Sequence, residues 1–293
     1  MNKGIFSAAF AYILWGFFPI YFKTLESVSP IEILCHRMVW SLVFLSGILV
    51  FTRQWDWLLP ALKNRRTVLI YLVAASLLAM NWFTYIWAVN SGFIVESSLG
   101  YFINPLISIL LGVFILREKL RPAQWFPVGI AALGVAYLTW IYGRLPWIAL
   151  ALAFTFGFYG LVKKISPLPS LKGLSLETGL LFLPALGYLL YREASGTAGF
   201  LHLSPWISIL LALAGVITAV PLLLFANGAR SIPLYLLGIL QYIAPTLQLL
   251  IGVFIYHESF SSQQFLGFGM IWLALGIYTL ESFLFSRRVA LNR

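Results

Sequence analysis

Long apolar stretches constrain the fold of this chain more than any other feature. Ten of them, each about 20 residues long, follow one another and are separated by short segments that hold most of the charges. A helix needs about 20 predominantly apolar residues to cross a bilayer, whereas barrel strands are about half as long and alternate in polarity. The sequence therefore predicts an all-α polytopic membrane protein. Its ten transmembrane helices are expected at 5–22, 31–51, 68–89, 94–116, 123–142, 145–163, 173–191, 205–228, 233–255 and 263–285.

The composition excludes a soluble domain. Hydrophobic residues make up 61% of the 293 residues and charged residues only 10%, against about 25% charged residues in ordinary soluble domains. So few charges cannot cover the surface of a soluble protein of this size, because charged side chains are the ones that normally lie on such a surface. The chain also has a single cysteine, Cys35, and so cannot form an internal disulfide.

The formal net charge of +10 would suggest nucleic-acid binding in a soluble protein. Here the basic residues lie between apolar runs, where they act as topology signals, and no nucleic-acid partner is expected. If the N-terminus is cytoplasmic, fifteen of the 19 Lys and Arg residues fall in cytoplasmic segments and three in outer ones. This asymmetry predicts that both termini are cytoplasmic.

A repeat is visible within the chain. Residues 105–139 align with residues 245–279 without a gap and are identical at eleven of 35 positions. Apolar residues match easily by chance, so the informative matches are those of polar and special residues. Pro105, Glu118 and Gln124 each recur 140 residues later.

The offset predicts two units of five spans, a first repeat at 1–142 and a second at 143–293. Because five is an odd number, the second unit enters the membrane from the opposite side, which makes an inverted-topology repeat. Many secondary transporters have this organisation, because two similar halves can open a central site first to one side and then to the other. The predicted function is therefore a secondary transporter. A channel or facilitator, or a membrane receptor that transports nothing, is the alternative.

Polar and aromatic side chains near the middle of the spans predict a substrate cavity. Buried amides need hydrogen-bond partners, which a solute or another helix supplies, and Trp and Tyr give flat apolar walls with a polar edge. Helix packing is the alternative role for any single residue. The expected cavity residues are Trp15, Asn81, Trp82, Tyr85, Tyr101, Asn104, Tyr159, Asn227, Gln241 and Tyr242.

Ionisable residues inside the spans are costly in a membrane and are therefore candidates for gating. Arg37 and Glu96 are expected in the outer half, and Lys163 and Glu177 in the inner half, so that each pair can close one side by forming an ion pair. Alternatively, Lys163 extends to the cytoplasmic surface. His36 is the histidine expected inside a span, and it and the two glutamates are the groups that would bind a coupling proton. A packed or an exposed position is the alternative role of His36.

Prolines and small residues predict where helices bend or approach each other. Pro19, Pro105 and Pro245 lie inside spans, and each removes a backbone hydrogen bond. Matched kinks are expected at Pro105 and Pro245, which are repeat equivalents. Gly215 and Ala219 have the four-residue spacing that allows close helix packing.

Several segments resemble a known family. They are WGFFP (15–19), EILCHR (32–37), NW (81–82), ESSLGYFINP (96–105) and PLLLF (221–225). In these the chain resembles RarD-type permeases, in the EamA branch of the drug/metabolite transporter superfamily, over essentially its full length. The resemblance implies ten transmembrane helices in a bacterial inner membrane, two EamA repeats and transport of small organic solutes. It does not name the solute.

Motifs for other chemistry are absent from the sequence. It has no phosphate-binding G-x-x-x-x-G-K-[ST] loop, no cluster with metal-ligand spacing, and no G-x-S-x-G or H-E-x-x-H motif. We therefore expect no enzymatic activity and no cofactor or metal. The expected partners are the lipid bilayer, a small solute that is a metabolite, amino-acid-like or drug-like, and protons as a coupling ion.

Overall fold

The computed structural model describes residues 2–90, 94–142, 147–256 and 261–291. The described residues form helices joined by short connections and contain no strand. The helices are α1 (Asn2–Gly16), α2 (Phe18–Lys23), α3 (Pro30–Thr52), α4 (Leu58–Lys63), α5 (Arg65–Asn90), α6 (Ile94–Phe114), α7 (Pro122–Tyr142), α8 (Trp147–Ile165), α9 (Ser170–Ala194), α10 (Pro205–Ser231), α11 (Leu234–Leu240), α12 (Ile243–Phe254) and α13 (Ser262–Leu291).

The predicted polytopic helical architecture is confirmed. Within the described residues, nine helical stretches are long and apolar enough to cross a membrane, and the apolar part of α6, Leu99–Phe114, adds a shorter one. Helices α1 and α2 together form the first span, and α11 and α12 form the ninth. The short helix α4 lies in the connection after α3, where the sequence predicts no helix.

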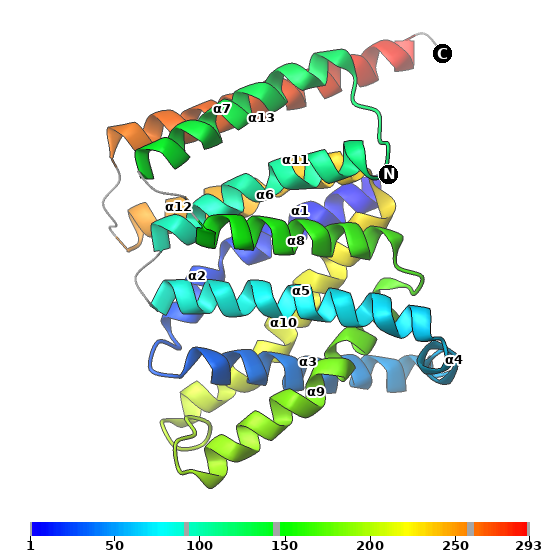
Figure 1. The fold of residues 1–293 in the computed structure, drawn as a ribbon, viewed down its shortest axis with the longest axis vertical. Helices are drawn as coiled ribbons and strands as arrows, with labels where there is room; N and C mark the ends of the chain where they lie inside the picture. The colour runs from blue at the N-terminus through cyan, green and yellow to red at the C-terminus, as the bar shows by residue number, and fades with distance from the viewer. Residues whose placement is uncertain (1, 91–93, 143–146, 257–260, 292–293) are drawn as a thin grey trace.

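The long helices run side by side across the molecule (Figure 1). Helices α7 and α13 pack against each other at one edge, α3, α9 and α10 pack together toward the other, and α1, α6, α8 and α11 lie between them. Helix α1 begins and α13 ends at the same face of the bundle, which we call the terminal face. Helix α5 ends and α6 begins at the opposite face, which we call the far face.

The distribution of side chains is inverted relative to a soluble protein. Large apolar side chains point outward, with Phe51 91% and Trp140 81% exposed. Among the residues that the structure describes, four charged side chains are buried, namely Glu32, Arg37, Lys163 and Glu177. This pattern fits a bundle whose outer surface faces lipid, because lipid chains solvate apolar side chains as well as a protein core does.

Helices α3 and α10 approach each other closely at Gly215. A Cβ atom on Gly215 would lie 2.3 Å from the backbone carbonyl carbon of Trp40, so no larger residue fits without moving one of the helices. The hydroxyl of Ser41 donates to the Gly215 carbonyl at 3.2 Å. The small-residue packing predicted at this position is present.

The first span is broken at Phe17, two residues before Pro19. Proline has no N–H, so the carbonyl of Trp15, four residues earlier, loses its helical partner. The side-chain amide of Gln248 donates to that carbonyl at 3.0 Å. A side chain of the ninth span thus satisfies the backbone group that the break in the first span leaves open.

The ninth span is also broken, at Gln241 and Tyr242, shortly before Pro245. Helix α6, in contrast, runs through Pro105 as one continuous helix. The two prolines occupy equivalent positions in the repeat, yet only the ninth span is interrupted near its proline. We expected matched kinks at the two prolines, but α6 is continuous through Pro105 and the ninth span is interrupted before Pro245.

The start of α11 is held by a residue from a distant part of the chain. Its own N-cap position is Pro233, which makes no side-chain capping bond. Instead the two carboxylate oxygens of Glu118, after α6, accept hydrogen bonds from the backbone N–H groups of Leu234 at 2.8 Å and Tyr235 at 3.0 Å. A carboxylate is favoured there, because the first N–H groups of a helix have no internal partner and carry partial positive charge.

Candidate substrate cavity and buried ion pair

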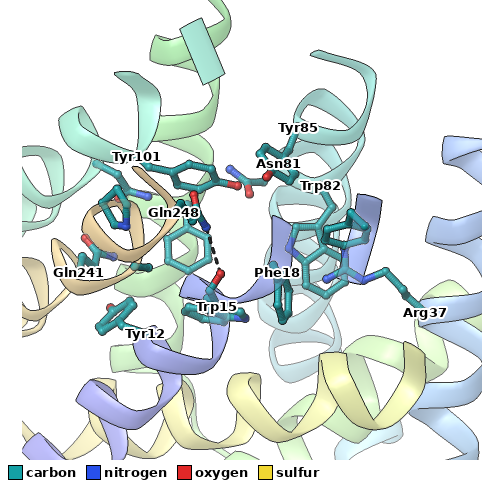
Figure 2. A pocket seen from close by; sticks show the side chains of 15 residues that line it. Tyr12, Trp15, Phe18, Arg37, Asn81, Trp82, Tyr85, Tyr101, Gln241 and Gln248 are labelled. Carbon is teal, nitrogen blue, oxygen red and sulfur yellow. Dashed lines mark hydrogen bonds between the residues drawn. The ribbon is translucent and has the colours of Figure 1, made fainter. Parts of the chain in front are cut away.

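The bundle contains a cavity (Figure 2), and the empty space within it and at its open mouth is about 610 Å³. Its lining residues come from the middle of the helices and from the parts nearer the far face. Its middle part is lined by Tyr12, Asn104 and Gln241, and the part nearer the far face by Phe22 and Tyr85. The other lining residues are Trp15, Phe18, Arg37, Asn81, Trp82, Tyr101, Phe156, Ala244, Pro245 and Gln248.

Most of the predicted cavity residues come together here. The ones that line this cavity are Trp15, Asn81, Trp82, Tyr85, Tyr101, Asn104 and Gln241. They come from α1, α5, α6 and the break before α12, so four separate segments converge on one space. Their shared depth in the membrane, read from the position within each span, is the signal that groups them.

Three predicted cavity residues lie elsewhere. Tyr159 is fully buried nearer the terminal face, and Asn227 is exposed and donates to the hydroxyl of Ser7 at 3.0 Å. Tyr242 packs with Phe102 on the side of the ninth span that faces α7 and α13. Tyr159 and Asn227 lie nearer the terminal-face ends of their helices than the cavity does. Tyr242 lies at the depth of the cavity but on another face, which depth alone does not specify.

The amides of the cavity connect helices. The Asn81 amide donates to the carbonyl of Leu152 and to the hydroxyl of Thr155, both at 2.9 Å. The hydroxyl of Ser108 donates to the Gln241 side-chain carbonyl at 3.0 Å. These bonds fix the walls, since a buried amide without a partner costs about 1–3 kcal/mol.

Several lining residues were not predicted from the sequence. They are Tyr12, Phe18, Phe22, Phe156, Ala244, Pro245 and Gln248. Gln248 could have been predicted from the sequence, because it follows Gln241 by seven residues. Seven residues are about two helical turns, which places both side chains on the same face. The apolar and aromatic members carry no such signal, since the same residue types also cover the lipid-facing surface.

Arg37 projects from α3 into the cavity, with its guanidinium group beside Trp82 and Phe18 (Figure 2). The guanidinium carbon lies 3.8 Å from the centroid of the Trp82 ring and 5.1 Å from that of Phe22, both within the range of a cation–π contact. Its Nε donates to the hydroxyl of Thr218 at 2.9 Å. Glu96, the predicted partner of Arg37, has a side chain that lies outside the described residues.

Lys163 and Glu177 form the second predicted pair, and this contact is present. The Lys163 Nζ lies 2.7 Å from Glu177 Oε1, and the Tyr159 hydroxyl donates to Glu177 Oε2 at 3.2 Å. Both charged groups are buried, and the Lys163 ammonium lies 5.6 Å from the centroid of the Tyr71 ring. Lys163 therefore does not extend to the surface, which was the alternative. The pair lies in the terminal half of the bundle, near the end of α8 and the start of α9.

His36 is buried near the far face. Its Nδ1 accepts from the indole N–H of Trp40 at 3.2 Å, and its Nε2 lies 4.0 Å from Glu32 Oε1. Glu32 accepts hydrogen bonds from the backbone of Gly199 and Phe200 in the loop between α9 and α10. His36 thus belongs to a cluster that anchors this loop, and it does not line the cavity.

Comparisons with known proteins agree with this architecture. Residues 2–140 match the EamA-like transporter family. An uncharacterized transporter, YojE, from Bacillus subtilis (strain 168) is 51% identical over 281 residues, which cover 95% of this chain and 94% of that protein. The protein RarD from Streptomyces exfoliatus is 45% identical over 95% of this chain and 88% of its own length. The protein RarD from Escherichia coli (strain K12) is 39% identical over 99% of this chain and 98% of its own length.

A solved crystal structure shares the fold. It superposes with a TM-score of 0.70 over 94% of this chain and 97% of that one, at 19% sequence identity. The relatives match along nearly the full chain, and several of them carry the name RarD or are described as transporters. The chain therefore belongs to the RarD-type permeases of the EamA-like transporter family, and it is a membrane transporter.

Proposed function

We propose that this transporter is a secondary carrier that moves a small organic solute by alternating access. The solute, a metabolite or an amino-acid-like or drug-like molecule, binds in the cavity beside Trp15 and Asn104. Two inverted halves, residues 1–142 and 143–293, then exchange conformations and open the cavity to the other side. The bacterial relatives and the basic connections support a place in the inner membrane with cytoplasmic termini, so that the terminal face is the cytoplasmic one.

Local contacts support the two-repeat organisation. The backbone N–H of Arg121 donates to the Gln124 side-chain carbonyl at 2.9 Å, and 140 residues later the N–H of Ser261 donates to that of Gln264 at 2.9 Å. The helices that these residues begin, α7 and α13, pack against each other. In the two predicted repeats α1 corresponds to α8, and α5 corresponds to α10. The pair α1 and α10 and the pair α8 and α5 are each in contact, as equivalent pairs should be.

The observation that carries the proposal is the difference between the two sides of the bundle. The cavity reaches toward the far face at Phe22 and Tyr85, whereas the terminal half holds the buried Lys163–Glu177 ion pair, which does not line the cavity. A carrier in one of its end states has this asymmetry, because only one side of the site is open at a time. In our proposal the ion pair is the terminal gate, and it separates when the terminal half opens.

A flux experiment tests the proposal. Purified protein is first screened by thermal stability against amino acids, nucleosides, drugs and osmolytes, and each stabilising solute is then tested in proteoliposomes. A carrier gives flux that saturates with solute, and it accumulates labelled solute transiently when the vesicles are preloaded with unlabelled solute. Flux that does not saturate and shows no such counterflow would indicate a channel and contradict the proposal. Repeating the assay with and without a pH gradient tests whether protons are coupled.

A further inference from the structure

Arg37 is the one charged side chain among the described residues that line the cavity. Only 2% of it is exposed. Its Nε is held by Thr218 at 2.9 Å and its planar group lies 3.8 Å from the centroid of the Trp82 ring, so its position is fixed from two sides. Figure 2 shows the guanidinium group at the cavity wall, beside Trp82 and Phe18.

No described residue supplies an anion to this cation. Arg37 Nη2 is buried and has no hydrogen-bond partner among the described residues. The two buried carboxylates of the described chain are engaged elsewhere. Glu32 binds the loop after α9 and Arg192, at 3.2 Å, and Glu177 binds Lys163.

A buried cation without a counter-charge is costly, by several kcal/mol relative to a paired one. An anion that enters the cavity would remove that cost, and it would accept a charge-assisted hydrogen bond from a guanidinium group that is itself almost unexposed. A guanidinium group matches a carboxylate best, because its parallel N–H groups can bind both oxygens. Within the part of the chain that the structure describes, the Nη2 donor of Arg37 has no partner and can make such a bond.

The rest of the wall is suited to an uncharged body. Trp15 and Phe156 present rings whose centroids are 5.5 Å apart, and Tyr101 adds a third aromatic ring. Asn104 and Gln241, at the middle of the bundle, are neutral hydrogen-bonding groups. The described lining thus combines one cation with aromatic surface and amides, and contains no carboxylate to receive an ammonium group.

We propose that the cavity binds an organic monoanion, with a carboxylate on Arg37 and an aromatic or apolar body against Trp15 and Phe156. This inference rests on the proposed function, because it takes the cavity to be the binding site of the transported solute. It predicts discrimination against zwitterions and cations, since an ammonium group would be repelled by Arg37 and would meet no carboxylate in the described lining.

The test uses four probes that share one ring and differ in charge. They are 3-phenylpropionate, its neutral amide 3-phenylpropionamide, the zwitterion phenylalanine and the cation 2-phenylethylamine. Each is titrated into the purified full-length protein, and binding is followed by tryptophan fluorescence, to which Trp15 and Trp82 in the wall contribute. The variants are Arg37→Gln and, as a matched control that removes an exposed arginine at the start of α5, Arg66→Gln.

We expect the wild type to bind 3-phenylpropionate at least about tenfold more tightly than the amide, and phenylalanine and 2-phenylethylamine more weakly than the acid. The Arg37→Gln variant should lose the preference for the acid while it still binds the amide, and Arg66→Gln should keep it. An acid that binds the wild type no better than the amide does, including the case in which neither binds, would overturn the inference without need of any variant. Preference for the acid that survives in Arg37→Gln would overturn it as well.

The proposed function fails in a different way. If 3-phenylpropionate binds through Arg37 but no solute shows counterflow in proteoliposomes, the cavity binds an anion and the protein is not a carrier. If a neutral or cationic solute shows counterflow that Arg37→Gln leaves unchanged, the protein is a carrier and the monoanion inference is wrong.

Discussion

Replacement of Glu177 by glutamine tests the terminal gate directly. The change keeps the size of the side chain and removes its charge, so Lys163 is left buried without a counter-charge. Only 1% of Lys163 is exposed, and its described surroundings include the rings of Tyr71 and Tyr159. The closed terminal half therefore becomes less stable than an open one in which the ammonium group reaches water.

The magnitude follows from the burial of the pair. Removing one partner of a buried ion pair costs about 3–5 kcal/mol. If the open state avoids this cost, a penalty of about 3 kcal/mol shifts the equilibrium toward the terminal-open state by roughly 100-fold. Adding Lys163→Met to Glu177→Gln removes the isolated charge. The terminal half should therefore be closed in a larger fraction of the double variant than of the single one.

Cysteine accessibility measures this shift. Thr178 lies next to Glu177, is buried, and its hydroxyl donates only within its own helix, to the carbonyls of Leu174 and Ser175, so Thr178→Cys is a mild change. Cys35, the natural cysteine, is first replaced by serine. A membrane-impermeant maleimide then reacts with inside-out vesicles, which present the terminal face if that face is cytoplasmic.

Adding Glu177→Gln to the Thr178→Cys protein should increase its labelling rate by at least about tenfold, because labelling requires opening of the terminal half. The matched control is Glu193→Gln on the same helix, an exposed acid whose partner is His202. A labelling rate that Glu177→Gln leaves within about twofold of the parent would refute the idea that this pair holds the terminal half closed.

Two further predictions concern the fold that carries the cavity. Gly215→Ala should lower the melting temperature in detergent by several degrees, because the new Cβ would lie 2.3 Å from the backbone of Trp40. The control is Gly187→Ala, whose Cβ meets no atom within 4 Å and which should leave the melting temperature unchanged or slightly raised. Equal effects of the two changes would show that α3 and α10 can separate without cost. Gln248→Leu should lower the free energy of unfolding by about 1–3 kcal/mol in a denaturation experiment, because the carbonyl of Trp15 loses the donor that replaces its helical hydrogen bond. An unchanged denaturation midpoint would mean that another group satisfies this carbonyl.

The sequence predicted the spans well because hydrophobic length is a property of each helix alone. The ten predicted ranges agree with the helical stretches to within a few residues at the ends that the structure describes, apart from the last helix, which continues to Leu291. The breaks were harder to predict. Pro19 and Pro245 each lie shortly after a break, but Pro105 lies in a continuous helix, so proline alone does not decide where a helix stops. Neighbouring helices decide whether the freed carbonyl finds a partner.

The candidate site was predicted only in part, because the sequence of one helix gives the depth of its residues but not the direction in which they face. Depth in the membrane placed Asn81 and Gln241 at the cavity, since depth follows from the position within a span. Asn227 lies near the terminal-face end of α10 and faces outward, because its place within the span and the rotation of the helix both depend on how α10 packs against its neighbours. The Lys163–Glu177 contact followed from depth and opposite charge together. Aromatic members such as Phe156 carry no signal that separates a cavity wall from a lipid-facing surface.

The bonds from Glu118 to the first residues of α11 have a consequence for biogenesis. This carboxylate leaves the ribosome 116 residues before the N–H of Leu234 that it receives. The acceptor is therefore synthesised before the helix start that it caps, and the N–H groups of Leu234 and Tyr235 find this partner only when the ninth span packs beside the segment after α6. Because a residue that follows α6 caps a helix of the ninth span, we expect this junction to form only when both segments are in the membrane.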